Sequence, residues 1–149
     1  MRVLGIDYGE KRIGVAIGDE LGFLAHGLTV IIRYGNEQDV EKIAQLVCEN
    51  NIKTLVVGYP VLLNGTEGIQ CKKVNDFIEI LSARITIPIV REDESCTSSY
   101  AAEIIRNSKS KRQRQHRRHG LVDKIAAVLI LQSYLERMRR YGIGEGGVL

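Results

Sequence analysis

Apolar residues gather in three short runs at the start of the chain, with polar turns between them. The runs are rich in Val, Ile, Leu and Thr and cover residues 2–8, 13–18 and 23–33. Short runs of this composition predict β-strands. Only a few residues, glycine among them, separate one run from the next. Because connections that short join antiparallel neighbours, we expect a three-stranded meander.

The middle of the chain alternates between helical and strand patterns. Residues 36–51 have apolar positions at helical spacing, whereas residues 53–60 form a nearly continuous apolar run. These patterns predict an amphipathic helix and then a strand covered on both faces. A second helix follows, with apolar positions at Val74, Phe77, Ile78 and Leu81. With a further strand over 85–92, the order predicts parallel βαβ units and an α/β fold with a mixed five-stranded sheet flanked by helices.

The last third of the chain is expected to be helical. Thr97 or Ser98 supplies an N-cap for a helix that ends near Asn107, because a short hydroxyl accepts a backbone N–H group there. A longer helix is expected over 121–140, with apolar residues at helical spacing. We expect the basic stretch between these two helices to interrupt the helical pattern.

Length and composition are those of an ordinary globular protein. The chain has 149 residues, of which 44% are hydrophobic and 26% charged. We expect residues 1–141 to form a single domain around one core and the glycine-rich tail, 142–149, to be flexible. No apolar run approaches the roughly 20 residues that span a bilayer. The three cysteines are far apart and have no zinc-ligand spacing. Together with the absence of a secretion signal, these features favour a cytoplasmic protein without a membrane partner.

The net charge is only +3, but the basic residues are unevenly distributed. The stretch 106–119 contains no acid, and its cationic side chains are Arg106, Lys109, Lys111, Arg112, Arg114, Arg117 and Arg118, with His116 and His119 among them. A local field of this kind attracts a polyanion, although a solvated basic loop is the simpler interpretation. We expect four of these residues to contact the backbone of a nucleic acid: Arg112, Arg114, Arg117 and Arg118.

One face of the first hairpin is unusually small. Side chains alternate across a strand, so Asp7 shares a face with Val3 and Gly5. On the next strand, the matching face consists of Gly14, Ala16 and Gly18. Small residues in a strand permit the close approach of another segment. The helix over 121–140 offers Ala126 and Ala127 for such contact. If it docks on this face, Asp123 comes near Asp7.

A third acidic group follows the strand over 85–92. Asp93 and Glu94 stand at its carboxyl end, where open α/β sheets gather ligand sites. Three carboxylates that converge without buried Lys or Arg partners repel one another unless a cation lies among them. Oxygen-only ligands favour Mg²⁺ or Mn²⁺, which promotes phosphodiester hydrolysis by polarising a phosphoryl oxygen and activating water. Each acid also has a simpler interpretation, as a turn residue or as compensation for a helix dipole.

Two further groups of residues fit a site of this kind. Lys11 and Arg12 follow Asp7 in the hairpin turn and can hold phosphates beside the cleaved bond, or simply be exposed turn residues. A loop facing the substrate would be shaped by Gly58, Pro60, Asn64 and Gly65. Glycine, proline and Asn-Gly are equally ordinary turn residues.

Four motifs in this order resemble one family. They are G-I-D-Y-G-E-K-R-I-G-V-A, then V-V-G-Y-P with N-G-T-E-G downstream, then D-E-S-C-T-S, and finally V-D-K-I-A-A-V-L-I-L-Q-S-Y-L. From Val3 to Tyr134 the sequence resembles the YqgF (RuvX-like) family of pre-16S rRNA nucleases. These proteins are also called Holliday-junction-resolvase-like and belong to the ribonuclease H-like superfamily.

The resemblance implies a ribonuclease H-like sheet with metal-binding, catalytic acids at Asp7, Glu94 and Asp123, and Asp93 stays open as a substitute for Glu94. It also implies Mg²⁺ or Mn²⁺ as cofactor and a role in maturing the 5′ end of the 16S rRNA precursor. The expected partners are nucleic acid, with pre-rRNA favoured over branched DNA, and ribosomal precursor particles. Monomer and homodimer are both compatible with the sequence.

Two positions depart from the family's pattern. Ser95 stands where the acidic motif usually has Arg, and Leu62 where the loop usually has Asn. Ser95 leaves open a non-catalytic RNA-binding factor of ribosome assembly. Within the nuclease class, a Holliday-junction resolvase-like DNA nuclease is the other alternative. A sugar-kinase or actin-like nucleotide binder is disfavoured, because such proteins close two lobes around ATP and this chain has the length of one.

Overall fold

The computed structural model describes residues 2–60, 68–93 and 111–141, the last segment with its side chains from residue 121 onward. Its centre is a five-stranded sheet in the order β3-β2-β1-β4-β5. The strands are β1 (Arg2–Tyr8), β2 (Arg12–Gly18), β3 (Ala25–Ile32), β4 (Ile52–Tyr59) and β5 (Ile89–Asp93). The first three strands pair antiparallel, and β4 and β5 are added parallel to β1. The mixed sheet expected from the sequence is therefore confirmed.

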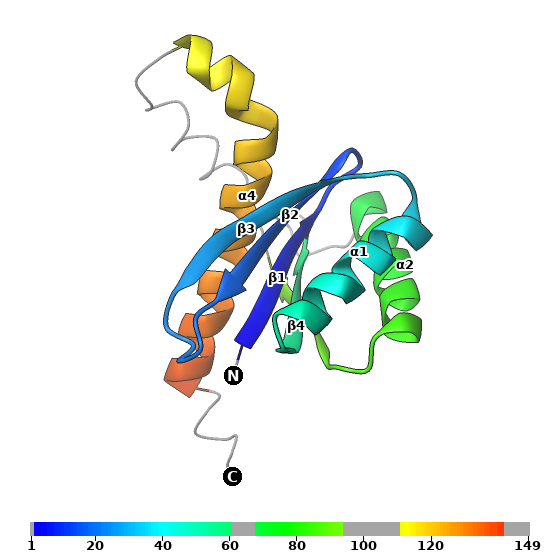
Figure 1. Ribbon diagram of the computed structural model, residues 1–149, viewed down its shortest axis with the longest axis vertical. Coiled ribbons are helices and arrows are strands. Elements are labelled where there is room, and N and C mark those ends of the chain that lie inside the picture. The colour runs from blue at the N-terminus through cyan, green and yellow to red at the C-terminus, as the bar shows by residue number, and fades with distance from the viewer. Residues whose placement is uncertain (1, 61–67, 94–110, 142–149) are drawn as a thin grey trace.

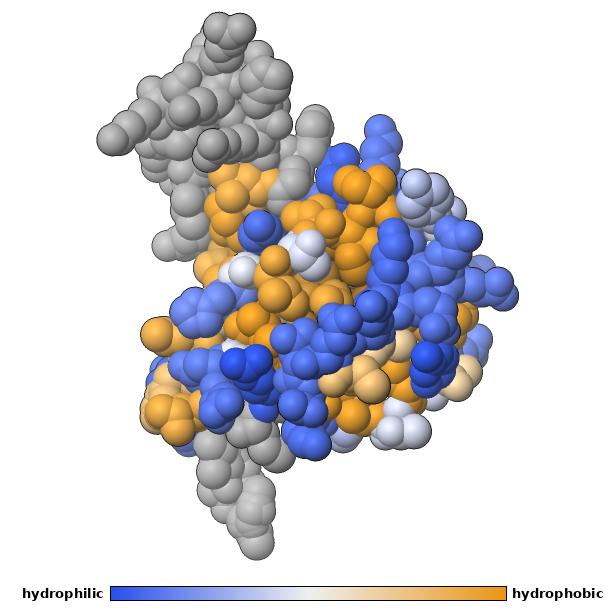
Figure 2. All heavy atoms as spheres, viewed as in Figure 1, coloured by the Kyte–Doolittle hydropathy of each residue, from blue (hydrophilic) through white to orange (hydrophobic). Residues whose placement is uncertain are grey.

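Helices cover both faces of this sheet (Figure 1). On one face lie α1 (Asn36–Glu49) and α2 (Ile69–Arg84), which pack side by side, and on the other face lies α4 (Lys111–Arg137). Figure 2 shows hydrophilic residues over α1, whose exposed positions are Glu37, Gln38, Glu41, Lys42, Gln45, Cys48 and Glu49. Among the described residues, no helix is long and apolar enough to cross a bilayer.

The alternation of side chains along β1 divides the core into two layers. Leu4, Ile6 and Tyr8 join the larger cluster, beneath α1 and α2, where Phe77 is fully buried. Val3 points to the opposite face and packs in a second cluster with residues of α4. The members of this second cluster are Val3, Ala16, Val56, Ala127, Ile130, Leu131, Tyr134 and Leu135. Asp7 belongs by its parity to the α4 face, as the sequence predicts.

The last strand begins later than the sequence predicts, at Ile89 instead of residue 85. Ile85 caps the end of α2, where its N–H group donates to the carbonyl of Leu81 at 2.9 Å. Pro88 has no N–H group to donate to a ladder, although its carbonyl accepts from the N–H of Leu55 at 2.9 Å. Strand pairing therefore starts only after this proline.

The prediction that the basic stretch interrupts the last helix is wrong. The helix α4 begins at Lys111 and runs through the basic residues into the segment over 121–140. Lys, Arg and Gln are good helix formers, and a single interior glycine, Gly120, costs only about 1 kcal/mol. From residue 138 to Tyr141 the chain continues in a wider helical turn. The helix predicted after Thr97 or Ser98 and the tail, 142–149, lie outside the described residues.

Candidate active site

Asp7 is held near the end of β1, on the face that α4 covers. Its pairing partner across the hairpin is Gly14 of β2. Only 8% of the Asp7 residue surface is exposed. A carboxylate this buried in an otherwise apolar layer is costly unless polar or charged groups surround it. Asp7 is therefore better explained as a residue of a functional site than as an ordinary core residue.

Gly14 lets the backbone of α4 lie directly on the sheet. A Cβ atom added at Gly14 would stand 2.0 Å from the carbonyl oxygen of Asp123 and 2.4 Å from its carbonyl carbon. Gly5 lies on the same face of β1, two residues before Asp7, and a Cβ added there would stand 2.8 Å from the Cβ of Leu131. Asp7 is the direct neighbour of Gly14 in the hairpin. The expected docking of this helix on the small face is therefore observed, and it sets the backbone of Asp123 against the strand partner of Asp7.

The small side chains of α4 complete this close contact. Ala126 and Ala127 are both fully buried against the sheet. One strand further out, the aliphatic chain of Lys124 crosses β3 where Gly27 leaves room, since a Cβ there would lie 2.6 Å from the Lys124 Cδ. Small residues on the helix and glycines on the sheet thus allow the close contact, and this contact sets the distance of the Asp123 backbone from the sheet.

Asp123 carries an ion pair that the sequence did not suggest. The Arg12 Nε donates to Asp123 Oδ2 at 2.9 Å, and 20% of the Asp123 side chain is exposed. The sequence-based expectation concerns only buried Lys or Arg partners, whereas Arg12 is a partly buried one, with 24% of its side chain exposed. Arg12 reaches Asp123 because it opens β2 only two residues before Gly14, close to the helix that Gly14 admits. A cation at Asp123 would compete with this guanidinium.

The sequence leaves two candidates for the third acid, Glu94 and Asp93. Glu94 lies outside the described residues. Asp93 pairs with Tyr59 of β4, whose ring packs in the cluster under α1 and α2. Paired residues share a face, so Asp93 belongs to the side of the sheet opposite Asp7. Of the two alternatives that the sequence left open, Asp93 is therefore placed less favourably.

Glu92 is a buried acid on the α4 face that sequence reasoning missed. It is only 6% exposed. Its Oε2 accepts from Ser133 Oγ at 3.0 Å, and its Oε1 accepts from the Arg137 guanidinium at 2.5 Å. The hydrogen bond to Glu92 raises the pKa of Arg137. Its place at an inward position of a strand was the available signal. These contacts fasten the end of α4 to β5.

The donor set suits a hard divalent cation but is incomplete in the described residues. Asp7 and Asp123 offer carboxylate oxygens only, which is the preference of Mg²⁺ and Mn²⁺. Among the residues for which the structure gives side chains, no group of three His, Cys, Asp or Glu side chains comes together. The family resemblance implies Glu94 as the third protein ligand, and Glu94 lies outside the described residues.

The remaining predicted site residues are placed as follows. Lys11 is exposed in the β1–β2 turn, and its carbonyl accepts from the N–H of Arg33 at 3.0 Å. Gly58 is buried in β4 and pairs with Glu92, while the Pro60 carbonyl accepts a 3.3 Å hydrogen bond from the thiol of Cys71. The residues outside the described backbone or side chains are Asn64, Gly65, Arg112, Arg114, Arg117 and Arg118.

The order of the mixed five-stranded sheet and the helices on both of its faces define a ribonuclease H-like fold. Thermus thermophilus RuvC in complex with a Holliday junction substrate has this fold, with a TM-score of 0.55 at 15% identity over 95% of this chain and 97% of that chain. The fowlpox virus resolvase, in complex with Holliday junction DNA, has a TM-score of 0.54 at 13% identity, covering 93% of this chain and 99% of that chain. These likenesses concern the fold alone.

The chain belongs to the RuvX family, described as Holliday junction resolvase, whose profile matches residues 1–137. A relative in Syntrophus aciditrophicus, named as a pre-16S rRNA nuclease, is 51% identical over 136 residues, which are 91% of this chain and 89% of the relative. One in Thermoanaerobacter pseudethanolicus with the same name is 42% identical over 139 residues, 93% of this chain and 99% of the relative. The resemblance inferred from the four motifs is confirmed.

Proposed function

We propose that this chain is a metal-dependent nuclease that hydrolyses phosphodiester bonds in the maturation of the 5′ end of 16S rRNA. The observation that carries the proposal is the docking of α4 on Gly14, in which the Asp123 backbone lies against the strand partner of Asp7. Family membership and the names of the relatives support the reaction class and the RNA substrate. The enzyme is a hydrolase acting on ester bonds.

The metal would be Mg²⁺ or Mn²⁺, held by Asp7, Asp123 and Glu94. Such an ion polarises a phosphoryl oxygen and lowers the pKa of a bound water. The chain's own contribution would be to present the two carboxylates from β1 and from the helix that docks on the sheet beside it. Asp93 is the weaker alternative to Glu94, since it pairs with Tyr59 on the other face of the sheet.

The basic residues would hold the nucleic acid. Arg12 stands beside Asp123, and Lys11 is exposed in the adjoining turn. A guanidinium can leave a carboxylate for a phosphate, because both ligands suit its planar fork of donors. The four arginines of the first turns of α4, expected to contact the backbone, are Arg112, Arg114, Arg117 and Arg118. Recognition would then rest on charge and shape more than on bases.

The decisive experiment is cleavage of a 16S precursor RNA in the presence of Mg²⁺. The variants Asp7→Asn and Asp123→Asn should each lose more than about 100-fold in rate, because even outer-sphere partners of a metal cost up to that factor. Asp76→Asn is the matched control, since Asp76 is exposed on α2. The proposal fails if the parent forms no metal-dependent product, and retained RNA affinity in that case would favour a non-catalytic assembly factor.

A branched-DNA resolvase is the second candidate. It is favoured by the description of the family and by the fold shared with RuvC bound to a Holliday junction. Competition between a four-way DNA junction and the precursor RNA distinguishes the two candidates. A resolvase binds as a symmetric dimer and prefers the junction, whereas an RNA-processing enzyme prefers the RNA. Ribosomal precursor particles as partner, the cytoplasm as location and the choice between monomer and homodimer stay predictions.

A further inference from the structure

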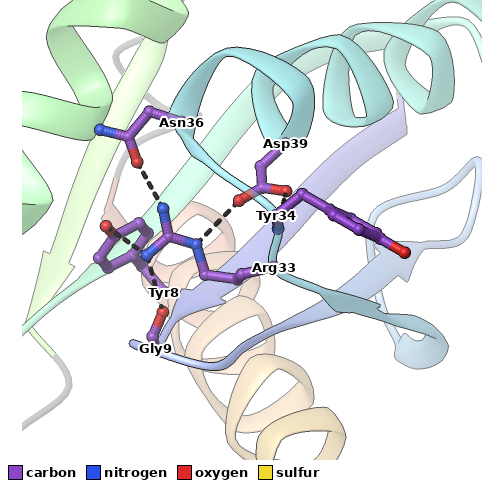
Figure 3. Close-up of polar contacts among 6 residues, drawn as sticks. All are labelled: Tyr8, Gly9, Arg33, Tyr34, Asn36 and Asp39. Atoms are coloured by element: carbon purple, nitrogen blue, oxygen red, sulfur yellow. Dashed lines mark hydrogen bonds and ion pairs between the residues drawn. The ribbon is translucent and has the colours of Figure 1, made fainter.

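Arg33 forms a buried ion pair on the face of the sheet opposite the acidic site. It follows β3 directly, and its Nε donates to Asp39 Oδ2 at 2.9 Å. Asp39 lies in the first turn of α1 and has 0% of its surface exposed. The second carboxylate oxygen of Asp39 accepts from the backbone N–H of Tyr34 at 3.1 Å. Figure 3 shows the Asp39 carboxylate between the Arg33 guanidinium and the Tyr34 N–H group.

The other donors of Arg33 reach the end of β1. One terminal nitrogen donates to the Tyr8 hydroxyl at 2.7 Å and to the Gly9 carbonyl at 3.3 Å (Figure 3). The guanidinium carbon also lies 4.5 Å from the centre of the Tyr8 ring. The remaining nitrogen donates to Asn36 Oδ1. The side chain of Arg33 therefore binds the two residues that directly follow Asp7.

The backbone of Arg33 holds the other end of the same turn. Its N–H group donates to the Lys11 carbonyl at 3.0 Å. Lys11 is followed by Arg12, which pairs with Asp123. One residue thus contacts the chain on both sides of the β1–β2 turn, immediately after one site residue and immediately before another. The turn itself is tight, since a Cβ at Gly9 would lie 2.6 Å from the Arg12 carbonyl oxygen.

Stabilisation of the fold does not by itself explain why charged residues occupy this place. A buried ion pair is no more stabilising than apolar residues of the same volume, because both charges lose their hydration. Tyr8 and Phe77 already fill the core at this place, with ring centroids 4.7 Å apart. Apolar packing does not orient the backbone, whereas a planar guanidinium that donates to the Tyr8 hydroxyl and the Gly9 carbonyl fixes the course of the chain there.

We propose that Arg33 is a positioning residue for the acidic site, which it controls through the backbone at Gly9 and Lys11. By holding both ends of the turn, Arg33 sets where the carboxylate of Asp7 and the guanidinium of Arg12 stand relative to Asp123. Asp39 orients Arg33 in turn. The inference rests on the proposed function for its catalytic consequence, but the geometry that it predicts is measurable without any substrate.

The test compares Arg33→Lys with Arg84→Lys. Lysine keeps a charge opposite Asp39 but loses the fork that reaches Tyr8 and Gly9. Arg84 lies on α2 and forms an exposed ion pair with Glu41 of α1 at 2.5 Å. The control substitution Arg84→Lys therefore makes the same chemical change away from the turn. The first measurement, by NMR without metal, is hydrogen exchange of the Arg12 Nε–H and of the backbone amides of residues 11–13. The second is the Mg²⁺-dependent cleavage of precursor RNA.

In Arg33→Lys, exchange at the turn should rise about 10-fold, the factor that corresponds to the loss of one hydrogen bond to a charged group. The kcat should fall by about 10-fold, as expected for an outer-sphere group, while KM stays within about twofold. Arg84→Lys should leave all three quantities unchanged. Tyr8→Phe removes only the hydroxyl that Arg33 binds and should shift exchange in the same direction, so it decides the matter if Arg33→Lys does not fold.

Unchanged exchange at the turn in a folded Arg33→Lys or Tyr8→Phe variant overturns the proposal. So does a lower melting temperature with kcat and exchange both unchanged, since that is the pattern of a purely structural residue. If the parent cuts no RNA, the proposed function has failed, and the exchange of the Arg12 Nε–H still decides whether Arg33 positions the site.

Discussion

Replacing Gly14 by alanine should separate the two acids of the candidate site. The added Cβ would stand 2.0 Å from the carbonyl oxygen of Asp123, whereas ordinary contact begins at 3.4 Å. The atom that it meets is backbone, which cannot rotate away. The helix α4 and the strand β2 must therefore move apart by about 1.4 Å at this point, the difference between those two distances.

This displacement has a cost in stability and a larger cost in activity. Overpacking of this kind typically destabilises a fold by about 1–3 kcal/mol. A misplacement of about 1 Å in a catalytic group costs on the order of 100-fold in rate. Gly14→Ala should therefore lower the free energy of unfolding by about 2–3 kcal/mol and reduce cleavage far more than the unfolded fraction explains.

Gly18→Ala is the matched control on the same strand and face. A Cβ at Gly18 would meet Leu135 Cδ1 at 3.5 Å, which is an ordinary contact. Alanine there should be neutral or stabilising by up to about 1 kcal/mol, because glycine loses more chain entropy on folding. Urea unfolding gives the stability of both variants, and cleavage of precursor RNA at low temperature gives the activity of the folded molecules. Equal stability and equal rates for Gly14→Ala and Gly18→Ala would refute the reasoning.

Two other changes test the surroundings of the site. Arg12→Gln removes the guanidinium that pairs with Asp123. We expect a stability change of about 1 kcal/mol or less for this partly buried pair, because the lost hydration of the two charges offsets their attraction. The Mn²⁺ affinity measured by calorimetry and the KM for RNA should both rise, whereas unchanged values of both would contradict competition at Asp123. Hydrogen bonds led by the one from the Phe23 N–H lower the pKa of Asp19. This carboxylate therefore stabilises the fold above the ordinary pKa of about 4 and loses the effect as pH falls through the lower folded value; Asp19→Asn should flatten the acid limb of thermal stability, and an identical acid limb would argue against it.

The small face of the hairpin could be predicted because it depends on local parity. Gly5, Asp7 and Gly14 occupy alternating positions, and a stripe of small residues needs a close partner wherever it lies in a fold. The alanines of the last helix were the matching signal. From these residues alone, the docking of that helix on the small face of the hairpin could be predicted.

The charged partners could not be predicted, because each pair joins residues that only the fold brings together. Arg12 and Asp123 are 111 positions apart, and Glu92 and Arg137 are 45 apart. Arg33 is a different case, since Asp39 is near in sequence but meets it only when β3 turns into α1. The start of α4 was missed for another reason, namely that charge density was taken as a sign of a loop although arginine and lysine favour helices.

The order of the elements along the chain affects how the protein folds while it is being synthesised. Synthesis runs from the N-terminus, so β1 with Asp7 is made before α4 with Asp123. Before α4 packs, Val3, Ala16 and Val56 lack the apolar residues of that helix as neighbours. The growing chain therefore passes through a stage in which this apolar face of the sheet is open to other contacts, and Asp123 can join Asp7 only after that stage.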